Sequence, residues 1–208
     1  MNDPLPLFGI TTTPLELVSF LLALVTVALN IRQNPWAWFF AIVSSALYAV
    51  VFYGARLYGD MSLQAVFIVV SFWGWYQWLR GGDEHQGIKV SRLRLAGKVL
   101  SVVAWLLSFL LIAVVLNNYT DTDVAYSDGF LTAGSLVGQV LLARKKLESW
   151  YVWIAVDVLY IGLYWYKDLL LTAVLYGVFV AMAIMGLLAW KKSMQQDTDL
   201  RSTLAGTA

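Results

Sequence analysis

The sequence predicts an all-α membrane protein with seven transmembrane helices in a parallel 3+1+3 pseudo-repeat. Of its 208 residues, 60% are hydrophobic and 13% are charged, whereas soluble domains carry about 25% charged residues. Seven apolar stretches are long enough to cross a bilayer, because about 20 helical residues span its hydrocarbon core. The last three stretches also resemble the first three, which indicates an internal repeat.

The apolar stretches leave no room for a soluble domain, so 1–208 is expected to form a single integral membrane domain. Pro14 suits the first turn of the first helix, and Asn34-Pro35 ends the segment before the second. The expected helices are about 14–31, 36–54 and 61–79 in a first half (14–79), 95–116 as a linking helix, and 125–143, 149–166 and 169–190 in a second half (125–190).

The connections between these helices carry lysine and arginine unequally, which predicts the orientation in the membrane. If the N-terminus is outside, only Arg56 and Lys167 of the 14 basic residues are outside, and 14 − 2 = 12 are inside. We therefore expect the N-terminus outside and the C-terminus in the cytoplasm. The N-terminus lacks the basic region of a cleaved signal peptide. The polar tail after Lys192 is expected to fray.

The internal repeat is clearest in the second helix of each half, where a shift of 112 residues (150 − 38) aligns the chain with itself. The shift superimposes Trp38 on Trp150, Ser45 on Asp157 and Tyr48 on Tyr160. For the third helices a shift of 108 aligns 58–67 with 166–175, which predicts a four-residue difference in the preceding loop. The linking helix lets both halves run in the same direction. Substrate sites in transporters with such repeats lie near mid-membrane at the repeat interface.

Asp157 is the only carboxylate in the apolar run 150–166. A carboxylate at mid-span costs roughly 2.5–3.5 kcal/mol on insertion scales, so it usually marks a pathway or a site. At 100° per residue, one face of this helix carries Trp150, Trp153, Asp157, Tyr160 and Tyr164. Aromatic faces and a carboxylate both attract a flat organic cation. Aromatic residues can also simply pack helices or form an interfacial belt, which would account for Trp150 on its own.

From about 14 to 192 the sequence resembles the PnuC-type vitamin transporters. The resemblance rests on RQNPWAWFFAIVSSALYAVVFYGARLYGDMSLQ and SFWGWYQW in the first half, and on GQVLLARKKLESWYVWIAVDVLYIGLYWYKDLLLTAVLY in the second. The spacing Trp150-x-x-Trp153-x-x-x-Asp157 is similar to the form associated with nicotinamide riboside uptake. Thiamine and riboflavin transporters share this fold, so another vitamin or a deoxynucleoside is the alternative substrate.

The resemblance implies a facilitator of the bacterial inner membrane with a fold akin to the SWEET sugar transporters. Transport in this family is thought to be uncoupled, with the nucleoside trapped by a cytosolic kinase. The partners expected are therefore nicotinamide riboside, the lipid bilayer and, through metabolism, a nucleoside kinase. The protein could also form a homo-oligomer, and no nucleic-acid partner is expected.

Nicotinamide riboside carries a pyridinium charge, a carboxamide and ribose hydroxyls, so its site needs aromatic faces, an anion and uncharged polar groups. The substrate-binding residues expected are Trp38, Ser45, Tyr48, Gln64, Ser71, Trp75, Gln139, Trp150, Trp153, Asp157 and Tyr160. For each polar residue alone, the alternative is a hydrogen bond between helices.

Two other classes of protein fit the sequence less well. An intramembrane enzyme needs an activated nucleophile or a metal, but the chain has no cysteine and no HExxH motif, and its single histidine, His85, lies in the polar loop 80–94. No catalytic residue, metal or cofactor is therefore expected. A proton or ion channel could use Asp157 as a relay, but the sequence shows no chain of titratable partners for it. A phosphate-cradling glycine loop is also missing.

Overall fold

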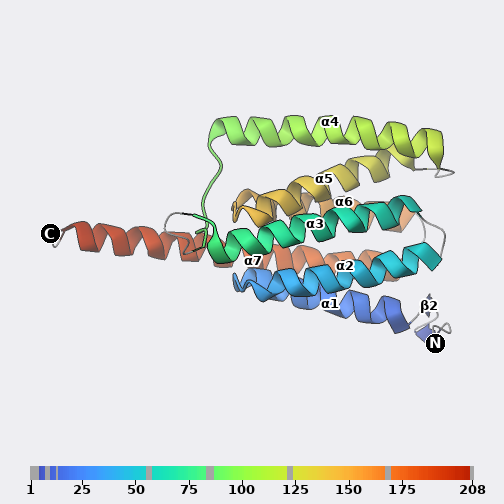
Figure 1. Cartoon of the computed structure of the whole chain (residues 1–208), viewed down its shortest axis with the longest axis horizontal. Helices are drawn as coiled ribbons and strands as arrows, with labels where there is room; N and C mark the ends of the chain where they lie inside the picture. The colour runs from blue at the N-terminus through green and yellow to red at the C-terminus, as the bar shows by residue number, and fades with distance from the viewer. Residues whose placement is uncertain are drawn as a thin grey trace. The chain divides into compact units, whose positions relative to one another are not determined.

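Seven helices make up nearly all of the chain that the computed structural model describes (Figure 1). The described residues are 5–7, 10–12, 14–54, 58–82, 87–120, 124–166 and 170–206. The chain divides into two compact units, Met1–Ile88 and Lys89–Ala208. Three residues used in the sequence argument, Arg56, His85 and Lys167, lie outside the described residues.

The observed helices follow the predicted ones in number and order. They are α1 (Pro14–Ile31), α2 (Trp36–Gly54) and α3 (Tyr58–Arg80) in the first unit, and α4 (Leu95–Tyr119), α5 (Ala125–Ala143), α6 (Glu148–Tyr166) and α7 (Leu170–Gly206) in the second. Two short antiparallel strands that the sequence did not predict, β1 (Leu5–Leu7) and β2 (Ile10–Thr12), precede α1. By length and composition alone, α4 and Ala173–Leu200 of α7 could each cross a membrane, and α1 and α2 hold shorter apolar helices.

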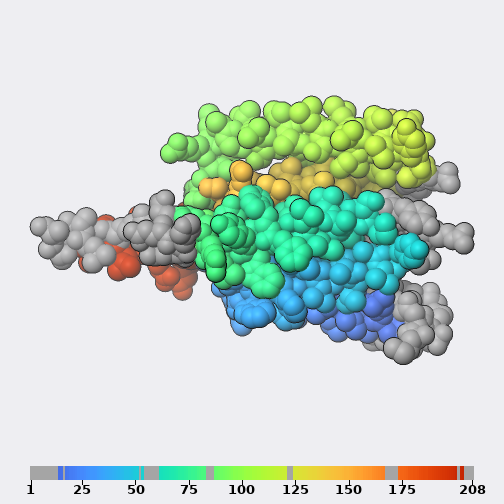
Figure 2. All heavy atoms as spheres, in the orientation of Figure 1, coloured from blue at the N-terminus to red at the C-terminus, as the bar shows by residue number. Residues whose placement is uncertain are grey.

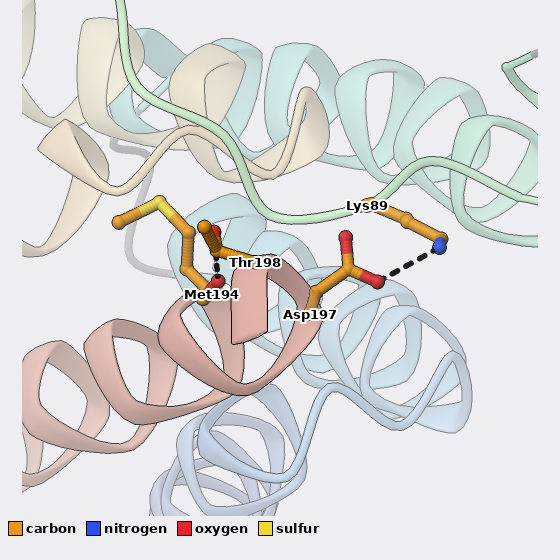
Figure 3. Close-up of polar contacts among 4 residues, drawn as sticks. All are labelled: Lys89, Met194, Asp197 and Thr198. Atoms are coloured by element: carbon orange, nitrogen blue, oxygen red, sulfur yellow. Dashed lines mark hydrogen bonds and ion pairs between the residues drawn. The ribbon is translucent and has the colours of Figure 1, made fainter. Parts of the chain in front are cut away.

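The prediction that the chain frays after Lys192 is wrong, because α7 continues as one helix to Gly206. The polar extension beyond Lys192 has a partner in the segment that precedes α4. Lys89 Nζ lies 3.0 Å from Asp197 Oδ1, and the Thr198 hydroxyl donates to the Met194 carbonyl within the helix (Figure 3). A hollow of about 580 Å³ lies beside this ion pair. The ion pair joins the extension to residues more than 100 positions earlier, which no local pattern could show.

Helices adjacent in sequence pack against each other in each unit. In the first unit α2 packs against both α1 and α3, and in the second α4 packs on α5, α5 on α6 and α6 on α7. The α1–α2 contact includes a buried hydrogen bond of 2.9 Å from the Ser44 hydroxyl to the Ser19 carbonyl. The α4–α5 contact includes one of 2.9 Å from Trp105 Nε1 to the Phe130 carbonyl. These two polar side chains are thus paired with backbone carbonyls across helix contacts.

The last two helices of each unit pack through the same contact, in which one tryptophan lies against a glycine and a second tryptophan of the facing helix. In the first unit the ring of Trp38 meets Trp78 edge to face at 5.4 Å and 90°, and a Cβ on Gly74 would lie 2.6 Å from Trp38. In the second unit Trp150 meets Trp190 at 5.4 Å and 87°, and a Cβ on Gly186 would lie 2.5 Å from Trp150. Only glycine lets the ring lie this close to the facing helix.

This packing corrects the register predicted for the third helices. The contacts that match are Trp38–Trp78 and Trp150–Trp190, and 190 − 78 = 112, the same offset as 150 − 38. The shift of 108 and the four-residue loop difference are therefore wrong. Similarity between 58–67 and 166–175 arose one helical turn out of register, because a displacement of four residues keeps apolar residues on nearly the same face.

The turn between the first two helices of each unit repeats in backbone detail. Gln33 and Lys145 are the described non-glycine residues with positive φ, at 54° and 47°, and 145 − 33 = 112. The amide of Gln33 bonds to the Asn30 carbonyl at 3.0 Å, and that of Lys145 bonds to the Leu142 carbonyl at 2.9 Å. A left-handed residue commonly ends a helix in this way. The two halves are therefore copies of one three-helix unit.

We expect Gly186→Ala to destabilise the protein by about 1–3 kcal/mol, because the new methyl group would collide with the Trp150 ring in a well-packed contact. The thermal midpoint of the purified protein in detergent should fall by several degrees. Gly177→Ala in the same helix is the matched control, since nothing lies within 4 Å of a Cβ there. That control should melt at the wild-type temperature or slightly higher, because alanine favours helix. Equal melting of both variants would contradict the Trp–Gly contact.

Candidate functional site

Asp157 lies on the buried side of α6, with 6% of its surface exposed. Within the described part of the chain no lysine, arginine or histidine forms an ion pair with it. The charged form of a buried carboxylate requires a compensating charge or hydrogen bonds. Asp157 is thus buried without a described cationic partner, and its role as counter-charge to a cationic substrate stays a prediction.

Three tyrosines from α6 and α7 gather near Asp157. The rings of Tyr160 and Tyr164 stack at 5.8 Å and 19°. The ring of Tyr176 lies 4.8 Å from the first and 5.1 Å from the second. Tyr164 and Tyr176 share a hydrogen bond, and Asp157 interacts electrostatically with Tyr176. We call Asp157, Tyr160, Tyr164 and Tyr176 the acid–phenol cluster.

Helix α5 holds the cluster from a second side. Ser135 and Thr132 hydrogen-bond to the phenol of Tyr160, and Asp128 contributes a further negative charge to its surroundings. The Ser135 hydroxyl also donates to the Leu131 carbonyl at 3.0 Å, as in an ordinary helix. Phenol faces and carboxylates both favour a cation, while the hydroxyls offer donors and acceptors. The arrangement therefore offers the kinds of group that a cationic aromatic ligand with polar substituents requires, and binding of such a ligand stays a prediction.

The predicted tryptophans occupy different surroundings. Trp38 and Trp150 are 1% and 2% exposed and pack within their own units as described above. Their indole Nε1 atoms find no acceptor among the described residues. Trp153 lies over α5, where a Cβ on Gly138 would be 3.2 Å from its ring. These contacts identify Trp38 and Trp150 as packing residues of the two halves, and a direct role in binding stays a prediction for both.

The first unit contains the remaining predicted residues, apart from Gln139. With the offset of 112, Ser45 corresponds to Asp157, Tyr48 to Tyr160 and Gln64 to Tyr176. Three predicted residues of the first unit thus take the positions that the acid–phenol cluster takes in the second. Ser71 is buried, with 1% exposure.

Trp75 belongs to an aromatic group at the end of α3. Its ring lies 6.0 Å from that of Trp36 and 6.2 Å from that of Phe39. Gln139 of α5 is half-buried, next to the glycine under Trp153. Trp75 therefore packs against neighbouring aromatic rings, and Gln139 lies next to a contact between α5 and α6. A role for either residue in substrate binding stays a prediction.

Two members of the cluster were not predicted to bind substrate: Tyr164, which was placed only on the helix face of Asp157, and Tyr176, which the sequence did not single out at all. The shift of 108 aligned Gln64 with Thr172 rather than with Tyr176. Continuing the offset of 112 through the third helices would have identified Tyr176.

A separate hollow of about 760 Å³ between α4, α5 and α6 contains none of the predicted residues; it is lined by Phe109, Phe130, Leu159 and Tyr166, among others. No group of three metal-binding side chains occurs among the described residues.

Repeated halves in a helical membrane protein and a buried polar cluster are features of small-molecule transporters. The protein is a member of the nicotinamide mononucleotide transporter family, whose sequence model matches residues 13–192. This confirms the predicted family, the all-α membrane fold and the prediction that the protein is a transporter and not an enzyme.

Characterised relatives and a solved structure resemble the chain over most of its length. The riboflavin/roseoflavin transporter RibM of Streptomyces davaonensis is 28% identical over 189 residues, which cover 88% of this chain and 87% of RibM. The nicotinamide riboside transporter PnuC of Escherichia coli is 20% identical, with 94% and 92% covered. A crystal structure of the vitamin B3 transporter PnuC superimposes with a TM-score of 0.68 at 27% identity and covers 88% of this chain and 82% of that one.

Proposed function

We propose that the protein carries nicotinamide riboside across the bacterial inner membrane by facilitated diffusion. The observation that carries this proposal is Asp157, which is buried, is unpaired with any described cation and interacts with Tyr176, one of three phenols in mutual contact. A positively charged pyridinium ring would supply the missing charge and stack on the phenols. The nicotinamide riboside transporters among the relatives and the solved PnuC structure support the same substrate.

Substrate sites in transporters built from repeats lie near mid-membrane. In the second unit Asp157, Tyr160 and Tyr176 would contact the substrate, and Ser45, Tyr48 and Gln64 offer uncharged polar groups at the corresponding positions of the first unit. The N-terminus is outside and the C-terminus is cytoplasmic. A cytosolic nucleoside kinase phosphorylates the vitamin and prevents its return.

Riboflavin is the second candidate substrate, because RibM is similar over nearly the whole chain. Riboflavin is uncharged, so Asp157 would then serve as a hydrogen-bond acceptor rather than as a counter-charge. The two candidates therefore differ in what they require of one carboxylate.

Uptake into liposomes that contain the purified protein tests both substrate and mechanism. Labelled nicotinamide riboside should enter and come to electrochemical equilibrium without a pH or sodium gradient. A fiftyfold excess of unlabelled nicotinamide riboside should abolish the uptake, whereas the same excess of riboflavin should not. Accumulation above equilibrium in the absence of a kinase would contradict facilitated diffusion. Uptake of riboflavin alone would assign the protein to the second candidate.

A further inference from the structure

The segment that leads into α4 is fixed to the turn between α5 and α6. The amide of Ser91 donates to the Lys145 carbonyl at 3.1 Å, and the amide of Leu147 donates to the Ser91 carbonyl at 2.9 Å. Lys146 Nζ donates to the Ser91 hydroxyl at 2.8 Å. The amide of Leu93 donates to Glu148 Oε2 at 3.0 Å. Two backbone and two side-chain bonds therefore hold this segment in one place.

Three cations project from this fixed segment and the first turn of α4. Arg92 and Arg94 alternate with Ser91 and Leu93, whose backbone groups bond to the turn, and both arginines are exposed. Lys98 follows Arg94 by four residues, and its amide bonds to the Arg94 carbonyl at 3.0 Å. That spacing brings Lys98 to the same side of the helix.

None of these three cations is neutralised within the described part of the chain. Arg92, Arg94 and Lys98 are exposed, and no ion pair of theirs is seen among the described residues, whereas the neighbouring Lys89 pairs with Asp197. The carboxylate of Glu148 accepts the amide of Leu93 on the side facing the turn. The three charges are thus available to an anion from outside the chain.

Apolar side chains of α4 begin directly beside these cations. Leu95, Val99 and Leu100 are 78%, 55% and 66% exposed, and within the second unit the main packing partner of α4 is α5. Figure 2 shows side chains of α4 at the molecular surface along the length of the helix. In a membrane protein such a surface faces lipid tails. From its N-terminal end, α4 therefore presents the three cations first and then an apolar surface suited to acyl chains.

We propose that Arg92, Arg94 and Lys98 bind the phosphate headgroup of an anionic phospholipid whose acyl chains lie along α4. Basic residues at the ends of transmembrane helices bind anionic headgroups in this way. Arginine suits the role because its guanidinium can donate two hydrogen bonds to one phosphate. Basic residues that only set the orientation of a protein in the membrane need no fixed geometry, whereas Arg92, Arg94 and Lys98 belong to or directly follow a hydrogen-bonded segment.

Native mass spectrometry of the full-length protein, titrated in detergent with phosphatidylglycerol or phosphatidylcholine, tests the proposal. Wild-type protein should bind phosphatidylglycerol saturably and at least tenfold more tightly than phosphatidylcholine. Each cation near an anionic lipid contributes about fivefold, so Arg92→Gln/Arg94→Gln should weaken phosphatidylglycerol about 10- to 30-fold. The matched control is Arg32→Gln/Lys192→Gln, which removes the same charge from two exposed positions elsewhere and should leave binding unchanged.

The remaining outcomes each overturn the proposal. Equal weakening in both double variants would show diffuse attraction between charges and no site. Displacement of the lipid by millimolar inorganic phosphate would show an ion site with no contribution from the acyl chains. Unchanged binding in Arg92→Gln/Arg94→Gln would place the lipid elsewhere. Melting temperatures of the variants, compared with wild type, verify that all are folded.

Discussion

Asp157→Asn should weaken the binding of nicotinamide riboside about 30- to 100-fold. The substitution keeps the size of the side chain and most of its hydrogen-bonding capacity, so it isolates the negative charge. Removing one partner of a buried charge pair costs about 2–5 kcal/mol. The lower part of that range applies here, because Asp128 contributes a second negative charge near the phenols. Titration calorimetry of the purified protein measures the change in affinity.

A ligand comparison separates charge from shape. The reduced form of nicotinamide riboside has an uncharged ring of nearly the same outline, so its affinity should change by less than about threefold. Asp199→Asn, which removes an exposed carboxylate from the α7 extension, should affect neither ligand. If Asp157→Asn weakens both ligands equally, Asp157 is a hydrogen-bond partner and the cation argument is wrong.

Lys145→Gln should stabilise the protein at pH 7 and change how its stability depends on pH. Lys145 lies in the turn between α5 and α6 with 8% of its surface exposed, and burial lowers the pKa of its ammonium from 10.5 to about 8. Between these values the unfolded chain binds a proton that the folded protein does not, so stability rises with pH. Below pH 8 the full cost of burying the charge is present, and above pH 10.5 it is absent.

The difference between the two pKa values corresponds to a loss of at most about 3 kcal/mol in the free energy of unfolding when Lys145 is charged. Lys145→Gln removes that cost, and Gln33 shows that the same turn in the first unit already accepts glutamine with positive φ. Thermal unfolding in detergent from pH 7 to 10 should show a rising midpoint for wild type and a flatter profile for the variant. Lys192→Gln, at an exposed position, should keep the wild-type profile. If the midpoint of Lys145→Gln rises with pH as much as that of wild type, a group other than Lys145 causes the pH dependence.

Helix positions could be predicted where apolar composition alone determines them. The predicted bounds of α1, α2 and α5 agree with the structure, because polar residues or Asn34-Pro35 end each apolar run abruptly. The end of α7 could not be predicted in this way. Its extension has no apolar stripe, and its ion pair with Lys89 comes from a distant part of the chain.

The site could be predicted only as far as one helix face can show it. Periodicity placed Asp157 and Tyr160 on one helix face, and Tyr176 of α7 interacts with both. Periodicity also placed Trp150 on that face, but Trp190 and Gly186 of another helix enclose it. The identity of a facing residue depends on the register between helices. An error of four residues in that register was enough to miss Tyr176.

No net insertion or deletion separates the two halves over 29–78 and 141–190, since turn, tryptophans and glycine all keep one offset. A single added residue within a helix would rotate everything beyond it by about 100° and carry Trp78 away from Trp38. Changes in chain length would therefore be eliminated in these regions during evolution even where individual side chains were free to diverge, as Ser45 and Asp157 have. Related chains should accordingly differ in length between α3 and α5 and beyond Lys192, and hardly at all within either half.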